Sequence, residues 1–445
     1  MAEPGLPPHW QAAGSPAPAS VARALPWGVA LGVVVATWGG PLLEPTRIPG
    51  NAGGGVYPRL NALVGTFVLG FPEPAPPPPL GALDRVIGLG ASVVGAPNAW
   101  KVAIVLALAA SALALWGAAA PLRDRWAAPA LVAVGLVGPA ATSAAANGDL
   151  PHLWAAALPL ALPASALPLG LVAVALFAPA WLSAFGACAV AAALRRARTD
   201  RIVALCAICA LGGAFAASGG VGPASPGALF VASSWGPTTS RLAALPLGVS
   251  TVAVLAGAAA VAPDARVPVA VAIGALAASF LSFPGTDALL AVGVLAALAL
   301  VRAASSLGRR LAPAAIVLGA SWMIIDSRSG APLPDATLEI PGALSPPALG
   351  PVLDLPTSAP YASRALWLQS AHGGAIAADA RGEVRPAIAR AVRRMLDGGC
   401  PDFRAMGFSR VALRREGEWR AAERAFECLG DPDEDDGFAA RWELR

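Results

Sequence analysis

Charged side chains are scarce in this sequence. Only 13% of its 445 residues are Asp, Glu, Lys or Arg, and 56% are apolar, whereas about 25% of the residues of a soluble domain are charged. Lysine occurs once, as Lys101, so arginine supplies nearly all of the positive charge. This shortage of charge excludes an ordinary soluble protein. The net charge of +4 comes from arginines between apolar runs, so we expect no nucleic-acid partner.

Residues that bind metals are also few. The three histidines, His9, His152 and His372, lie far apart in the sequence, whereas a zinc site needs three or four ligands at short spacing. The acidic stretch at 431–437 has Asp436 where a calcium-binding EF-hand loop has glycine. The sequence therefore predicts no metal site and identifies no cofactor, and a divalent metal has no support from it.

Long apolar runs are abundant. A helix that crosses a membrane needs about 20 mostly apolar residues, and several runs reach or approach that length. We expect nine spans, at residues 26–43, 98–120, 127–147, 168–194, 202–219, 244–262, 267–283, 288–304 and 312–326. The predicted fold is a mainly α, polytopic transmembrane helix bundle followed by a C-terminal α/β domain outside the cytoplasm.

The arginines between these runs predict the orientation. They fall mainly in alternate loops, as in "RRARTDR" at 195–201, and such residues concentrate on the cytoplasmic side of a membrane. With the N-terminus inside, residues 1–25 form a disordered cytoplasmic tail, and residues 26–326 form the transmembrane domain with its first outer loop at 44–97. Residues 327–445 then form an extracytoplasmic domain. The Ala, Gly, Pro and Arg content is typical of a GC-rich bacterial genome, so we expect the bacterial inner (cell) membrane. No cleavage site follows the first span, which favours an uncleaved anchor over a signal peptide.

The C-terminal segment has the pattern of a small α/β domain. Residues 351–355 and 408–414 are typical of strands, 384–397 has the apolar spacing of a helix, and a second helix and a last strand follow. Cys400 and Cys428 share this domain and, with the orientation above, an oxidising compartment in which a disulfide can persist. We expect that disulfide, with two unpaired thiols as the alternative.

Three stretches resemble a known family. They read "GGGVYPRLNALV" at 53–64, "LGALDRVIGLGASVVGAPNAWKVAIVL" at 80–106 and "VLDLPTSAPYASRALWLQSAHGGAIA" at 352–377. They resemble the polytopic glycosyltransferases of the C superfamily, in particular a bacterial branch of it, while the middle spans match only in hydropathy. Members of this superfamily move sugars from polyprenyl-phosphate donors on the outer membrane face. The resemblance therefore implies the lipid bilayer and a polyprenyl-phosphate sugar as partners.

The resemblance fails at a position that carries chemistry in that family. The first loop of the family holds a carboxylate that acts as a base or helps to bind a metal, and Gly55 falls at that position here. Glycine can neither take a proton nor bind a cation. Glu44 and Asp84 are the substitute catalytic acids, although Glu44 can equally be a polar residue at a span boundary and Asp84 a solvated partner of Arg85. The resemblance therefore implies either an active glycosyltransferase or a catalytically degenerate relative.

Substrate contacts are expected on the outer side. Arg59 and Arg241 are the cations best placed to meet a phosphate, with anchoring at the membrane interface as the alternative. The resemblance adds Tyr57 of the first loop, and His372 either touches substrate or forms a turn.

Two functions remain open at this point. The first is an integral membrane glycosyltransferase-like protein, active or degenerate. The second is a non-catalytic membrane scaffold whose outer domain binds a partner or a cell-envelope polymer. A transporter is disfavoured because the spans hold almost no charged residues.

Overall fold

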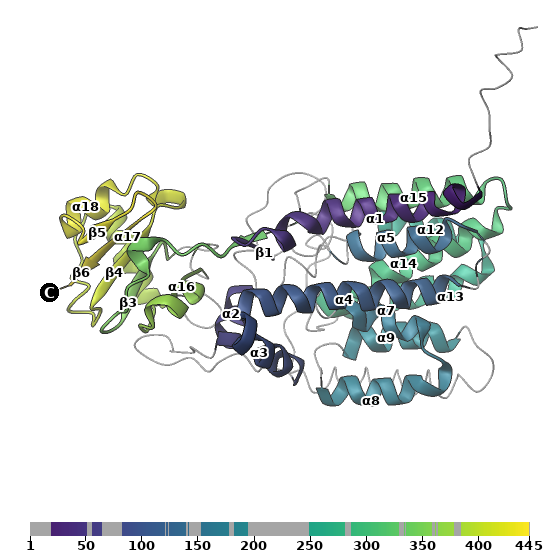
Figure 1. Cartoon of the computed structure of the whole chain (residues 1–445), viewed down its shortest axis with the longest axis horizontal. Helices are drawn as coiled ribbons and strands as arrows, with labels where there is room; N and C mark the ends of the chain where they lie inside the picture. The colour runs from purple at the N-terminus through teal and green to yellow at the C-terminus, as the bar shows by residue number, and fades with distance from the viewer. Residues whose placement is uncertain are drawn as a thin grey trace, which may run out of the picture.

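The computed structural model consists of a helical bundle with a mixed α/β lobe at one end (Figure 1). The residues that it describes are 19–50, 56–64, 82–120, 122, 124–138, 141, 153–177, 182–194, 249–280, 286–328, 333, 335–357, 361, 364–377 and 384–444. The expected span at 202–219 and all but the last residues of the expected tail at 1–25 lie outside these ranges.

Apolar helices build the bundle. They are α1 (Ala19–Leu43), α4 (Ala96–Ala119), α5 (Ala127–Val137), α7 (Leu153–Ala161), α8 (Leu167–Phe177), α9 (Leu182–Leu194), α12 (Val249–Val261), α13 (Arg266–Phe280), α14 (Thr286–Ser306) and α15 (Ala312–Arg328). Two segments of the described chain, Ala24–Leu43 and Ala96–Ala119, are long and apolar enough to cross a membrane. The nine expected crossings are therefore not shown. The single span expected at 168–194 is two helices, α8 and α9, so that expectation was wrong.

Small residues let these helices approach one another closely. The buried core of the bundle is rich in alanine, and α4 packs against α5 and α7 while α14 packs against α5, α9, α12, α13 and α15. On α8, a Cβ atom added to Gly170 would lie 2.6 Å from Cζ of Phe185 on α9. Helix contacts through glycine and alanine are typical of membrane bundles, where packing rather than apolar burial drives association.

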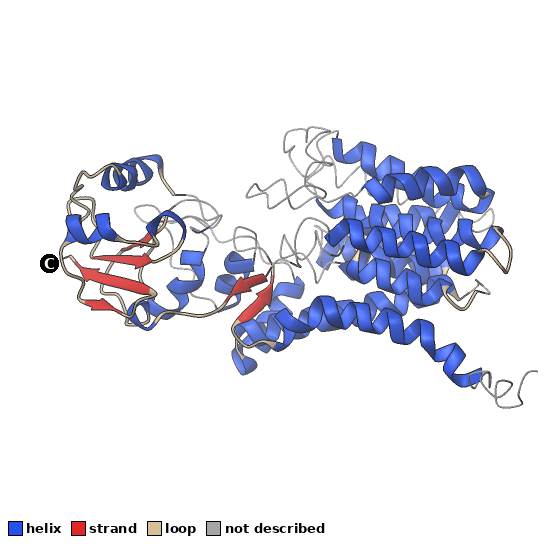
Figure 2. Cartoon of the chain, turned by 90° about the horizontal axis from the view of Figure 1, so that it is seen from above, coloured by secondary structure: helices blue, strands red, loops and turns tan. Residues whose placement is uncertain are grey.

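The C-terminal lobe contains a four-stranded sheet (Figure 2). Its strands are β3 (Val352–Leu355), β4 (Arg410–Arg414), β5 (Glu434–Asp435) and β6 (Ala439–Glu443), in the order β3-β4-β6-β5. β3 and β4 are parallel, and the other neighbours are antiparallel. Three helices, α16 (Arg364–His372), α17 (Pro386–Leu396) and α18 (Glu423–Leu429), complete the lobe.

The two faces of this sheet differ in chemistry because side chains alternate along each strand. One face carries Leu353, Val411 and Trp442, which pack with α17 and α18 into the core of the lobe. The other face carries Asp354, Arg410 and Arg414, all of them buried. The lobe thus holds an apolar core on one side of its sheet and a charged layer on the other.

Candidate functional site

The first loop and the C-terminal lobe meet at the same end of the bundle (Figure 1). A short strand that follows α1, β1 (Arg47–Pro49), pairs antiparallel with β2 (Asp335–Thr337), which precedes the lobe. The ion pair between Arg47 and Asp335, 3.1 Å apart, lies at the edge of this ribbon. Segments almost three hundred residues apart are thereby held together where α1 ends.

Helix α2 (Val56–Val64) of the first loop is docked on the lobe. The hydroxyl of Tyr57 donates to the carbonyl of Thr337 at 2.8 Å, and Nδ2 of Asn61 donates to Oε1 of Gln369 on α16 at 3.0 Å. Burial raises the pKa of Tyr57 to about 12, although Arg364 and Arg414 oppose that rise. Tyr57 is therefore a neutral phenol whose hydrogen bond joins α2 to the segment that leads into the lobe. The structure thus places the tyrosine that was expected to bind substrate at this junction.

Two cations lie near the N-terminal end of α4. The guanidinium of Arg59 lies over the ring of Trp100, 5.6 Å from its centroid. Nζ of Lys101 donates to the backbone carbonyl of Glu44 at 2.5 Å, which ties α4 to the end of α1. A cation over an indole ring is held by the negative face of the ring system, so Arg59 has a defined position beside α4.

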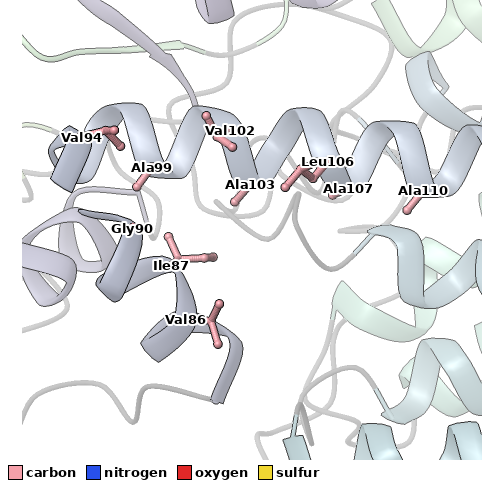
Figure 3. Close-up of a pocket in the computed structure, with 10 residues that line it drawn as sticks. All are labelled: Val86, Ile87, Gly90, Val94, Ala99, Val102, Ala103, Leu106, Ala107 and Ala110. Atoms are coloured by element: carbon pink, nitrogen blue, oxygen red, sulfur yellow. The ribbon is translucent and has the colours of Figure 1, made fainter. Parts of the chain in front are cut away.

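An apolar pocket of about 500 Å³ lies between α3 (Ala82–Val94) and α4 (Figure 3). Its lining residues are Val86, Ile87, Gly90, Val94, Ala99, Val102, Ala103, Leu106, Ala107 and Ala110. None of these side chains carries a polar atom, so the pocket suits a hydrocarbon chain rather than a sugar or a phosphate. It follows α4 from its N-terminal end, where Trp100 and Arg59 lie, to Ala110.

Glu44, one of the two expected catalytic acids, is not among the described residues that line this pocket. Glu44 is 45% exposed at its side chain and forms an ion pair with Arg47 at 3.3 Å, and the hydroxyl of Thr46 donates to the same carboxylate at 3.1 Å. Asp84 lies in the first turn of α3, and its side chain is outside the described atoms. Gly55 and Arg241 fall outside the described residues as well.

His372 lies in the lobe, far along the chain from the first loop, at the C-terminal end of α16. Its Nδ1 accepts the backbone N–H of Gly374 at 3.1 Å, so the proton of the neutral ring is on Nε2. Nε2 lies 3.9 Å from Oδ2 of Asp354 on β3, and both side chains are buried. Burial, with the positive charge of Arg410 nearby, lowers the pKa of His372 to about 4.

Asp354 is a buried acid in an unusual environment, and the sequence alone did not identify it as a candidate site residue. Burial raises its pKa to about 7, although Arg414 and Arg410 on the neighbouring strand oppose the rise. Neither carboxylate oxygen has a hydrogen-bond partner in the described part of the chain. The sequence does contain a signal for this residue, because Asp354 is an acid within the otherwise apolar segment "PVLDL". The pattern of that segment predicts only a strand.

Each arginine beside Asp354 has a carboxylate partner of its own. Nε of Arg410 donates to Glu443 at 2.8 Å, and its other nitrogens donate to the carbonyls of Pro346 and Pro347. Arg414 pairs with Glu416 at 2.7 Å. The charged face of the sheet thus carries its own ion pairs between arginine and glutamate side chains.

The two cysteines of the lobe are adjacent free thiols in this structure. Burial, and next a hydrogen bond with Cys400, raise the pKa of Cys428 to about 12. The pairing of these residues as a disulfide stays a prediction. Among the described residues, no group of three or more His, Cys, Asp or Glu side chains is arranged to hold a metal ion.

Comparisons with known proteins point to a fold rather than to a family. No protein-family model matches the chain, and no curated protein sequence matches it. A solved structure that matches is the single-particle cryo-EM structure of arabinofuranosyltransferase AftD from Mycobacteria, with a TM-score of 0.50 at 18% sequence identity. The match covers 90% of this chain but only 35% of that structure, so this chain spans about a third of its length. The chain therefore shares a fold with part of that structure.

Proposed function

We propose that this chain is a bacterial membrane glycosyltransferase-like protein that acts on a polyprenyl-phosphate sugar at the end of the bundle where α2, α3 and α4 meet. The observation that carries the proposal is the fold match to an arabinofuranosyltransferase over 90% of the chain, bundle and lobe together. The proposed orientation places this end and the lobe outside the cytoplasm of the inner membrane.

The pocket between α3 and α4 supports the lipid part of this proposal. Its lining is entirely apolar and belongs to one amphipathic helix and one membrane-length helix. The polyprenyl chain would lie in this pocket. Its phosphate would then lie at the outer end, where Arg59 is held over Trp100, because a guanidinium binds phosphate through two parallel hydrogen bonds. Arg241 is the second proposed phosphate contact.

The reaction needs a base on the same side. A carboxylate would take the proton from an acceptor hydroxyl as that oxygen bonds to the anomeric carbon, while the polyprenyl phosphate leaves with the electron pair of the broken C–O bond. Glu44 and Asp84 are the candidates. Glu44 would first have to leave Arg47, with which it is paired in the structure.

Single alanine variants test this role. We expect Glu44→Ala or Asp84→Ala to reduce sugar transfer from a polyprenyl-phosphate pentose by about a hundredfold or more, because general-base catalysis contributes about 10²- to 10⁴-fold. Asp264→Ala is the matched control. Asp264 precedes α13 and lies near Arg302, which is close to the C-terminal end of α14. Transfer by purified protein in nanodiscs is the measurement. Unchanged turnover in both test variants removes both acids as catalysts.

A second function, a non-catalytic membrane scaffold, is favoured by one specific observation. No carboxylate is among the described residues that line the pocket, and Glu44, the candidate acid whose side chain is described, is neutralised by an arginine. A scaffold would bind the lipid-linked sugar or an envelope polymer without turning it over. Wild-type protein that binds the donor but yields no product with any acceptor would support this second function over the first.

A further inference from the structure

Helix α2 joins the lobe to the end of α4 that carries Trp100. It lies between α16 and the N-terminal end of α4 and packs against both (Figure 1). Tyr57 and Asn61 are four residues apart on α2, so they share one side of the helix, and both are fully buried. Arg59 does not share that side. Its side chain is only partly buried, and its guanidinium lies over the ring of Trp100. One side of α2 is thus held by the lobe and the segment that leads into it, while Arg59 reaches the pocket end of α4.

The lobe holds α2 through the carboxamide of Gln369 on α16. Oε1 of Gln369 accepts a hydrogen bond from Nδ2 of Asn61 at 3.0 Å, and its Nε2 donates one to the carbonyl of Gly374 at 3.1 Å. A backbone carbonyl can only accept, so Nε2 must face Gly374 and Oε1 must face Asn61. Gln369 is 1% exposed. The carboxamide is therefore fixed in orientation at both of its ends.

The backbone at Gly374 is a firm anchor for this carboxamide. Its N–H donates to Nδ1 of His372 at 3.1 Å, and the carbonyl of His372 accepts the N–H of Ala348 at 2.8 Å. A Cβ atom on Gly374 would lie 2.7 Å from the carbonyl oxygen of Gly350 and 2.9 Å from Cγ2 of Val352 on β3. The sheet of the lobe therefore sets the position of Gln369 through close backbone packing.

We propose that Gln369 is a positioning residue for the phosphate site, which fixes the guanidinium of Arg59 through Asn61 and helix α2. This inference rests on the proposed function, because it takes Arg59 as a contact to the phosphate of the lipid. Gln369 acts through Arg59 and does not itself touch the lipid. The lobe thereby takes part in recognising the donor, although none of the described residues that line the pocket belongs to it.

The physical basis of this role is preorganisation. An arginine side chain that is free before binding loses rotamer freedom when it binds, and this loss weakens binding. Here the helix that carries Arg59 is held by Gln369, and its guanidinium is held by the indole ring of Trp100. Much of the loss is therefore met before the lipid arrives. Without the carboxamide, α2 can move relative to α4, and the affinity for a phosphate group falls. The pocket between α3 and α4 keeps its affinity for the apolar chain.

The test measures binding to the full chain in nanodiscs of neutral lipid with two probes, a polyprenyl monophosphate and the uncharged polyprenol. Gln369→Met keeps the size of the side chain and removes both hydrogen bonds. We expect it to weaken binding of the monophosphate about threefold to tenfold, the usual worth of a buried hydrogen bond. Binding of the polyprenol should stay within about twofold of wild type, the error expected for independent sites. In an Arg59→Ala background, Gln369→Met should cause no further loss, because its effect passes through that guanidinium.

Trp367→Phe is the matched control. It removes a buried hydrogen bond of the same helix, from Nε1 of Trp367 to the carbonyl of Leu338, which does not go to α2. Both probes should bind it within about twofold of wild type. Asn61→Ala breaks the bond to Gln369 from the α2 side and should give the same phosphate-specific loss. It therefore serves as the second test variant if Gln369→Met does not fold.

Three outcomes would overturn the proposal: wild-type affinity of Gln369→Met for the monophosphate, an equal loss for both probes, or a further loss in the Arg59→Ala background. An equal loss for both probes would mean that Gln369 supports the pocket and not the phosphate contact. Weaker binding of the monophosphate in Arg59→Ala without any loss in Gln369→Met would overturn this inference alone. Wild-type affinity in Arg59→Ala would instead overturn the phosphate contact of the proposed function, on which the inference rests.

Discussion

At the scale of single residues, Asp354 and His372 respond to burial in opposite ways. Burial favours the neutral form of each, which raises the pKa of the acid to about 7 and lowers that of the imidazole to about 4. The folded lobe therefore binds more protons at Asp354 than the unfolded chain does, between about pH 4 and 7. At His372 it binds fewer, between about pH 4 and 6.5. The two contributions to stability have opposite slopes with pH and largely cancel in that window.

Each single variant should expose the slope of the remaining residue. In Asp354→Asn, stability should rise from pH 4 to 6.5, because only the histidine must stay uncharged. In His372→Asn, stability should fall from pH 4 to 7, because only the buried acid must stay protonated. Over its pH range, the free energy of unfolding of each variant should change by a few kcal/mol, at about 1.36 kcal/mol per pKa unit. Amide exchange of β3 and β4, corrected for intrinsic rates, measures this stability. Slopes of the same sign in both variants would contradict the assignment.

At the scale of elements, the predicted and observed structures agree where the pattern is local. The strand-like composition at β3 and β4 and the apolar spacing in α17 are properties of short segments, and those elements lie where they were expected. The docking of α2 on α16 through Asn61 and Gln369 has no such local signal, because it joins segments that only the tertiary fold brings together. For the same reason the ion pair of Arg47 with Asp335 could not be predicted, because 288 residues separate the two in the chain.

The thiol of Cys400, in the turn after α17, and that of Cys428, on α18, are free and form a hydrogen bond with each other. Diamide should oxidise them to a disulfide, with the two electrons and two protons passing to the diamide. The closed loop should stabilise the lobe by about 3 kcal/mol, within the usual range for native disulfides. Intact mass after alkylation, together with urea titration, measures both effects. Cys400→Ser is the control and should show neither; free thiols that persist under diamide would rule out the pairing.

At the scale of the whole molecule, α2 links the bundle to the lobe. Its buried Asn61 supplies hydrogen bonds to α16, including that to Gln369. Asn61→Ala should leave a buried acceptor unsatisfied, at a cost of about 1–3 kcal/mol. We expect faster amide exchange in both α2 and α16. Asn98→Ala removes an exposed local bond to the carbonyl of Val94 and should change neither helix. Unchanged exchange in the Asn61 variant would mean that the lobe is held by other contacts.

The ribbon of β1 and β2 imposes an order on biogenesis. The two strands lie at positions 47–49 and 335–337, so Arg47 and Asp335 are 288 residues apart in the chain. Ribosomes add about 5–20 residues each second, so the first strand must wait tens of seconds for its partner. Throughout that interval its edge has unsatisfied backbone groups, available to any other extended chain. A nascent protein halted before the second strand would carry this unprotected edge, which makes the synthesis of β2 the event that seals the junction.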